Sequence, residues 1–146
     1  MESPQQVQLR EFNCMYHEVD SLYHEVTLKS GLSDGSFLIL YSIVELGDGC
    51  LQIDIVNRYF ISKQTVSSSV RTLEKKGYLY LKHGKKRDMH LYLTEQGRDF
   101  AAKHILPLME AENGVFASMS QEDSRELLRL TRVYTHIIRE KIGQIL

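Results

Sequence analysis

The chain has 146 residues, 42% of them apolar, which is enough for one domain with a single core. Its two cysteines, Cys14 and Cys50, form neither a CxxC pair nor a disulfide framework, so we expect a reducing compartment. There is no signal-peptide pattern and no apolar run long enough to cross a bilayer. We therefore expect a cytoplasmic protein with no membrane partner.

The formal net charge of -1 hides an uneven distribution of charge along the chain. Residues 58–87 hold nine Lys or Arg against one acid, Glu74, whereas the rest holds nine Lys or Arg against eighteen acids. Such segregation suits a nucleic-acid reader, because one face attracts phosphate while the remainder stays soluble. The alternative is a solvated charged face without a partner.

Apolar residues between about Gln6 and Lys29 recur at spacings of three and four, which predicts a helix with one apolar face. This face holds Phe12, Met15, Tyr16, Val19, Leu22, Tyr23 and Val26. Gly31 should end the helix, and Ser33 should cap a second one. The centre of that second helix, FLILYSIVEL, is apolar nearly all round and hence expected to be buried, and residues 47–49 predict a turn.

Two short helical patterns follow, with room for only a tight turn around Ile61 between them. The first pattern is Ile53, Val56 and Phe60, and the second is Val66, Val70 and Leu73. Ser62 can cap the second helix, and Gly77 can end it by taking a positive φ. Two helices joined so closely predict a helix-turn-helix.

After Gly77 the periodicity changes to that of strands, so Leu79–Lys82 and Met89–Leu93 predict a β-hairpin with a basic tip. Thr94 should open a long helix that Pro107 kinks. Ser120 should cap the last helix. The apolar face of that helix holds Leu127, Leu130, Tyr134, Ile137, Ile138, Ile142 and Ile145. The chain is therefore predicted to be mostly α with a small β-hairpin wing, an α+β winged helix-turn-helix.

On a helical wheel the residues Val66, Val70 and Leu73 share one side, which leaves a polar outer face. Gln can pair with adenine, Arg with guanine, and hydroxyls with bases or phosphates, so this face suits the major groove. Predicted contacts of this recognition helix are Lys63, Gln64, Thr65, Ser67, Ser68 and Arg71. Predicted wing contacts are Lys82, Lys85, Lys86 and Arg87, of which Arg87 is preferred for entering a minor groove. The alternatives are a plain solvent face for the serines and protective charges on an edge strand.

These segments resemble the MarR family of winged helix-turn-helix transcription regulators. The resemblance runs in element order from about Leu32 to Ile142 and is sharpest at ISKQTVSSSVRTLEKKGYL and KKRDMHLYLTEQG. It implies that Gln64, Thr65, Ser67, Ser68 and Arg71 face the groove and that Arg87 is the wing arginine. The chain departs from the family at Lys85, where the family usually has Asp.

The resemblance also implies a homodimer with interlocking terminal helices. We predict a single MarR-like domain over residues 1–146, with dimerisation helices at about 6–30 and 100–146 and the DNA-binding lobe at about 33–97. The apolar faces of the first and last predicted helices also favour a dimer, because a small winged domain could not cover both. Two-fold symmetry predicts a near-palindromic operator with recognition helices roughly 34 Å apart. Alternatively, both faces pack within the monomer.

Regulation by a small ligand, a metal or an oxidant is a further implication of the resemblance. An aromatic effector would enter near Tyr16, His17, Phe37 and Tyr41, although these can equally be core residues. His17, His24 and His104 lack the tight spacing of zinc ligands, so no metal or other cofactor is predicted. Cys14 is either a redox sensor or an inert thiol.

The expected function is sequence-specific transcription regulation, as a repressor that a small aromatic ligand releases from DNA. The alternatives are a winged-helix module that binds only protein, and a redox- or zinc-responsive regulator. An enzyme is not expected, because the sequence holds no nucleophile–base pair at useful spacing, no glycine-rich phosphate loop and no metal-ligand cluster.

Overall fold

A computed structural model describes all of residues 1–146, which divide into two compact units, Met1–Leu106 and Pro107–Leu146. The first unit contains four α-helices, a three-stranded sheet and the start of a further helical segment. The second unit contains helices only. The prediction of a mostly helical chain with a small β-hairpin is confirmed.

The N-terminal helix α1 (Pro4–Ser30) has the predicted extent and end. Ser3 caps it by accepting the Gln6 N–H, and the Gln6 side chain accepts the Ser3 N–H in return. Gly31 ends it in the left-handed conformation, with φ of 80°. Thr27 is its one buried residue, so most of the apolar face of α1 lies exposed. Phe12, Met15, Tyr16, Val19, Leu22 and Tyr23 expose 41–63% of their surface.

Helix α2 (Asp34–Leu46) forms the centre of the core in the first unit. Ser33 caps it through the Ser36 N–H, as predicted. Its apolar residues Phe37, Ile39, Leu40 and Ile43 are buried. The buried Ser42 hydroxyl donates to the Leu38 carbonyl, which satisfies this polar group within the helix.

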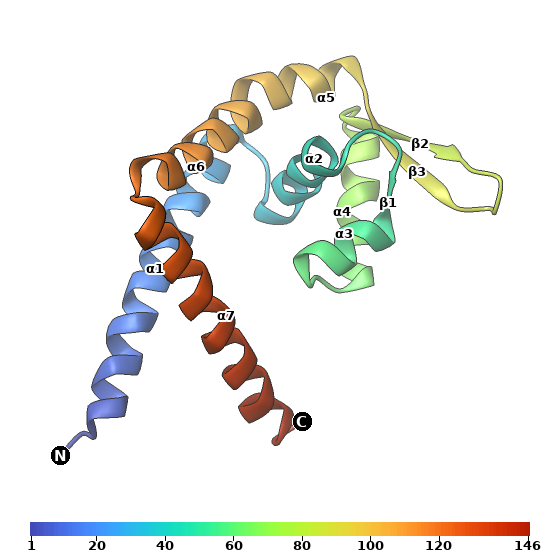
Figure 1. The fold of residues 1–146 in the computed structure, drawn as a ribbon. Helices are drawn as coiled ribbons and strands as arrows, with labels where there is room; N and C mark the ends of the chain where they lie inside the picture. Colours follow the sequence, from blue (N-terminus) through green and yellow to red (C-terminus); the bar gives the residue numbers. More distant parts are fainter. The chain divides into compact units, whose positions relative to one another are not determined.

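Helices α3 (Gln52–Tyr59) and α4 (Lys63–Lys75) form the predicted helix-turn-helix. The second apolar pattern is confirmed, because Val66, Val70 and Leu73 are all buried. Ser62 caps α4 by accepting the Thr65 N–H, and Gly77 follows the helix with φ of 84°. Figure 1 shows these two helices beside α2.

The first apolar pattern was assigned to the wrong residues. Ile55 is the buried residue of α3, whereas Ile53 is 40% exposed and Phe60 is 89% exposed. Helix α3 starts only at Gln52 and has barely two turns, so one position faces the core. Phe60 lies beyond its end in the left-handed conformation, with φ of 54°. This conformation turns the chain into α4.

The sheet has the strand order β1–β3–β2 and is antiparallel throughout. The hairpin β2 (Leu79–His83) and β3 (Met89–Leu93) is confirmed, with Leu79 opposite Leu93 and Leu81 opposite Leu91. The short strand β1 (Cys50–Leu51) adds to the free edge of β3 and was not predicted. In Figure 1 the hairpin projects away from the helices as a wing.

A helical segment follows the wing as α5 (Glu95–Phe100), a π-helical turn η1 (Ala101–Ile105) and α6 (Leu106–Ser118). Thr94 caps it, as predicted. The predicted kink at Pro107 stays a prediction. The backbone inserts a π turn immediately before this residue, with the Leu106 N–H donating to the Ala101 carbonyl. Because proline cannot donate and crowds the preceding turn, the wider π turn accommodates it.

The last helix, α7 (Gln121–Gly143), begins at its predicted cap, Ser120. Neither α6 nor α7 has a buried residue. The apolar residues Leu127, Leu130, Tyr134, Ile137, Ile138 and Ile142 of α7 expose 36–50% of their surface. No helix of the chain has both the length and the apolar character to span a membrane.

Candidate nucleic-acid interface

The outer face of α4 presents polar and basic side chains to solvent. Its predicted contact residues Lys63, Gln64, Thr65, Ser68 and Arg71 are exposed, and Ser67 is half-buried. The three buried residues on the opposite side of the helix fix which face is turned outward. The predicted groove-facing side chains therefore share one exposed surface.

Hydrogen bonds at the start of α4 hold two of these hydroxyl groups in place. The Ser62 hydroxyl accepts the Thr65 N–H at 3.1 Å and donates to the Thr65 hydroxyl at 2.8 Å. The Ser68 hydroxyl donates to the Thr65 carbonyl at 3.3 Å. The Thr65 hydroxyl consequently keeps its own proton for an outside acceptor, while Ser68 can still accept.

One member of the serine run in α4 has a packing role that the sequence did not reveal. A Cβ added at Gly35 would lie 3.0 Å from the Ser69 hydroxyl oxygen, so α2 and α4 approach closely at this point. A larger side chain at position 69 would separate the two helices. Ser69 therefore packs between the two helices, whereas Ser68 is exposed on the outer face and Ser67 is half-buried.

The wing presents cations at its tip and along one strand. Lys82, Lys85, Lys86 and Arg87 are all exposed. The Lys82 ammonium lies 5.9 Å from the centre of the Tyr92 ring, a cation–π distance, and Tyr92 stacks on Tyr80 across the hairpin. Arg87 has φ of 60°, an uncommon conformation for a residue with a side chain.

Only one of the nine cations between residues 58 and 87 is neutralised within the fold. Arg58 donates to Glu45 at 2.6 Å, and Tyr59 also donates to that carboxylate. The hydrogen bonds from Tyr59 and Arg58 lower the pKa of Glu45 from its ordinary value. The other eight cations are exposed and form no ion pair: Lys63, Arg71, Lys75, Lys76, Lys82, Lys85, Lys86 and Arg87.

Residues 30–87, from the end of α1 to the tip of the wing, match a family model described as MarR family. Over this segment, which is less than half of its length, the chain is similar to the MarR family. No curated protein matches the sequence. The solved structures that resemble it are distant in sequence, and their likeness concerns the fold.

Three of these solved structures cover nearly the whole chain. NMB1585, a MarR family regulator from Neisseria meningitidis, is 23% identical with a TM-score of 0.78, over 95% of this chain and 99% of that one. The Staphylococcus aureus MepR–DNA complex is 20% identical with a TM-score of 0.71, over 92% and 99%. Staphylococcus aureus MarR in complex with salicylate and kanamycin is 21% identical with a TM-score of 0.69, over 93% of each chain.

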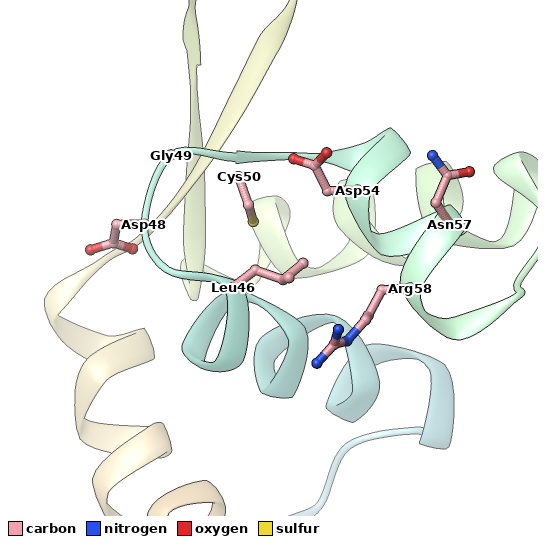
Figure 2. Close-up of a pocket in the computed structure, with 7 residues that line it drawn as sticks. All are labelled: Leu46, Asp48, Gly49, Cys50, Asp54, Asn57 and Arg58. Carbon is pink, nitrogen blue, oxygen red and sulfur yellow. The ribbon is translucent and has the colours of Figure 1, made fainter.

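The first unit also has a surface pocket of about 570 Å³ between the end of α2, β1 and α3. Figure 2 shows the Cys50 thiol directed toward Leu46, with Asp48 and Asp54 at separate places on the rim. Both carboxylates already serve the fold: Asp48 accepts from the Leu93 N–H and from Arg98, and Asp54 accepts from the Leu51 N–H. The pocket therefore has no carboxylate free of structural hydrogen bonds.

The residues predicted to line an effector pocket lie in different environments. Tyr16 is 63% exposed on α1, with its ring edge-to-face with His17. Phe37 is 6% exposed and packs against Phe100, with ring centres 6.0 Å apart. Tyr41 is half-buried on α2. A ligand pocket at these four residues stays a prediction.

The two cysteines differ in environment. Burial, with a smaller effect of Asp54, raises the pKa of the Cys50 thiol to about 11, which disfavours the reactive thiolate. Cys14 is exposed on α1, where it lines a groove of about 520 Å³ with His17 and other residues of that helix. Redox sensing at Cys14 stays a prediction. No three His, Cys, Asp or Glu side chains lie together as metal ligands would.

The sequence reasoning overlooked two residues at the base of the wing, Asp88 and His90. His90 lies within hydrogen-bond distance of Gly49, 41 residues earlier in the chain. No motif marks this contact, because it exists only once β1 has joined the edge of β3. The contact could not be predicted because strand β1 itself was not predicted.

Proposed function

We propose that this protein is a homodimeric, sequence-specific DNA-binding transcription regulator. The observation that carries the proposal is the set of eight exposed, unpaired cations on α4, the residues just after it, and the wing. Cations without an ion-pair partner in the fold can release counterions from DNA phosphates, which supplies most of the affinity for a duplex. A regulator of this kind acts in the cytoplasm.

Sequence preference would come from the outer face of α4. Gln64 and Arg71 are exposed and can make paired hydrogen bonds to adenine and guanine. Lys63, Thr65, Ser67 and Ser68 would place the helix against phosphates. In the wing, Lys82, Lys85 and Lys86 would contact the DNA backbone and Arg87 would enter the neighbouring minor groove. The similar MepR structure is a complex with DNA, which supports this use of the fold.

A second copy of the chain is the proposed occupant of the two exposed apolar faces. Large apolar patches are rare on monomers, and each of α1 and α7 exposes at least six large apolar residues. A two-fold dimer would cover both faces and set the recognition helices about one DNA turn apart, roughly 34 Å, on a near-palindromic operator. Packing of both faces within one monomer is the outcome that would refute this step.

A small aromatic effector would release the protein from its operator and so relieve repression. A similar structure contains salicylate, which makes salicylate the natural probe. The proposed entry point is near Tyr16, His17, Phe37 and Tyr41. Salicylate should weaken operator binding in proportion to its preference for the unbound form of the protein, since coupling is reciprocal.

The test is selection of bound sequences from random duplex DNA with the purified full-length chain, followed by affinity measurements. We expect a near-palindromic sequence that binds at least about a thousandfold more tightly than scrambled duplex. Arg71→Ala and Gln64→Ala should reduce that preference, whereas the matched loss of an exposed cation in Lys141→Ala should not. Failure to bind any duplex at low salt would leave the protein-only module as the function.

A further inference from the structure

A polar cluster connects the wing to the body of the lobe. The Nδ1 atom of His90 on β3 lies 2.6 Å from the carbonyl oxygen of Gly49. Because a carbonyl oxygen only accepts, Nδ1 carries the proton in this contact. The opposite ring nitrogen, Nε2, lies 3.4 Å from the Asp88 carboxylate. One imidazole thus lies between the wing and the loop that precedes β1.

The Asp88 side chain has few other partners. Its Oδ1 atom is buried without a hydrogen bond, and its Oδ2 atom faces His90. A buried acceptor without a donor is unfavourable, and native structures keep such groups where they serve a purpose. Asp88 directly follows Arg87, so whatever holds Asp88 also limits where Arg87 can lie.

Glycine at position 84 is required for this cluster to assemble. A Cβ there would collide with the Asp88 carboxylate and lie 2.5 Å from Nε2 of His90. The Gly84 N–H also donates to the Asp88 carbonyl at 2.8 Å, which closes the loop of Lys85, Lys86 and Arg87. The tip of the wing is therefore built on the cluster.

The conformation of Arg87 indicates that its surroundings determine it. A side chain at φ of 60° is unfavourable, and such conformations persist when neighbouring contacts impose them. The contacts next to it are those of Gly84, Asp88 and His90.

We propose that His90 and Asp88 are positioning residues for the wing arginine. They tie the tip of the wing to the Gly49 carbonyl and so fix the location of Arg87 relative to α4. Neither residue needs to touch DNA. This role rests on the proposed function, since it matters only if Arg87 contacts a duplex.

A double-mutant cycle between His90 and Arg87 tests the role on the selected duplex. In the native background Arg87→Ala should weaken binding about tenfold. In the His90→Ala background it should weaken binding only about twofold, because a misplaced arginine contributes little to DNA affinity. Equal losses in the two backgrounds, with His90→Ala still folded by circular dichroism, would overturn the proposal. Absence of binding by the native protein would instead overturn the proposed function.

Conservative variants separate positioning from general support of the fold. The amide nitrogen of His90→Asn can occupy the place of Nδ1. In the His90→Asn background, Arg87→Ala should therefore again weaken DNA binding about tenfold. His90→Gln places its amide near Nε2 instead and should not restore it. Restoration by both variants, or by neither, would contradict an essential bond to Gly49.

The native protein offers a readout that requires no variant. Nitrogen-15 NMR of the imidazole should show a proton on Nδ1, as the bond to Gly49 demands; an attractive contact with the Asp88 carboxylate requires a second proton, on Nε2. A proton on Nε2 alone would overturn the proposal even if every variant failed to fold.

Discussion

The proposed DNA-binding lobe and the terminal helices differ in the kind of residue that each leaves exposed. In the lobe, α2 and α4 bury their apolar residues and leave eight unpaired cations outside. The terminal helix α7 buries none of its residues and exposes an apolar face, and α1 exposes most of its own. The lobe therefore completes its own core, whereas the terminal helices leave their apolar faces for the proposed second copy to cover.

The largest expected effect comes from a charge placed on the apolar face of α7. Ile137→Arg places a cation where the second copy would bury it, which is strongly unfavourable. We expect a monomer, and operator affinity that falls about a thousandfold, to the level of non-specific binding. Analytical ultracentrifugation and fluorescence anisotropy would measure both. The matched control is His136→Arg on the polar face of α7, which should stay dimeric; a dimeric Ile137→Arg protein would contradict the assignment.

A second comparison pairs a core leucine with a leucine of the proposed dimer interface. Leu40 is 0% exposed, so Leu40→Ala should lower the free energy of unfolding by about 3 kcal/mol at any protein concentration. Leu130 is 50% exposed in the single chain, so Leu130→Ala should destabilise in a concentration-dependent way, through the dimer. Chemical denaturation at several protein concentrations distinguishes the two. Identical concentration dependence for both variants would remove the distinction between lobe and terminal helices.

The lobe should also lose stability in acid through Glu45. Hydrogen bonds from Tyr59 and Arg58 put the folded-state pKa of Glu45 below its unfolded value. The resulting stabilisation is full above the unfolded pKa and disappears as pH falls through the folded one. Glu45→Gln should therefore cost about 1.5 kcal/mol near neutral pH and much less in acid, measured by urea denaturation. A loss that does not change with pH would contradict this account.

The smallest expected effect concerns the turn between α3 and α4. Phe60 has φ of 54° and is 89% exposed. Glycine relieves the left-handed strain but is more flexible when unfolded, so Phe60→Gly should gain about 0.5 kcal/mol. Phe60→Ala keeps the strain and should gain nothing. Equal thermal stability of the two variants would show that the conformation carries no strain.

Local patterns predicted most of the fold. Caps at Ser33, Ser62, Thr94 and Ser120 were predictable because each side chain bonds within its own first helical turn. The apolar side of α4 followed from its period. The residues on the outer face of α4 and the cations of the wing could also be predicted, because the spacing of residues within a helix or strand determines which side chains share a face.

The errors involve contacts that are distant in the sequence or elements that are very short. Strand β1 has two residues and exists because β3 offers an edge, so no periodicity marks it. The cluster of His90 with Gly49 depends on that strand. In α3, a helix of eight residues, three apolar positions could not identify the one that faces the core. Arg58 was counted as a free cation because its partner, Glu45, lies on another helix.

The most direct test of the cationic surface is the salt dependence of binding to the selected duplex, for the native chain and for Lys85→Ala with Lys86→Ala. For the native chain, affinity should fall steeply, by roughly a thousandfold or more between about 50 and 200 mM salt. Removing two phosphate contacts should make the logarithmic slope shallower by about 2. A native affinity that ignores salt, or a slope unchanged by loss of both lysines, would contradict the claim that α4 and the wing together bind the DNA backbone.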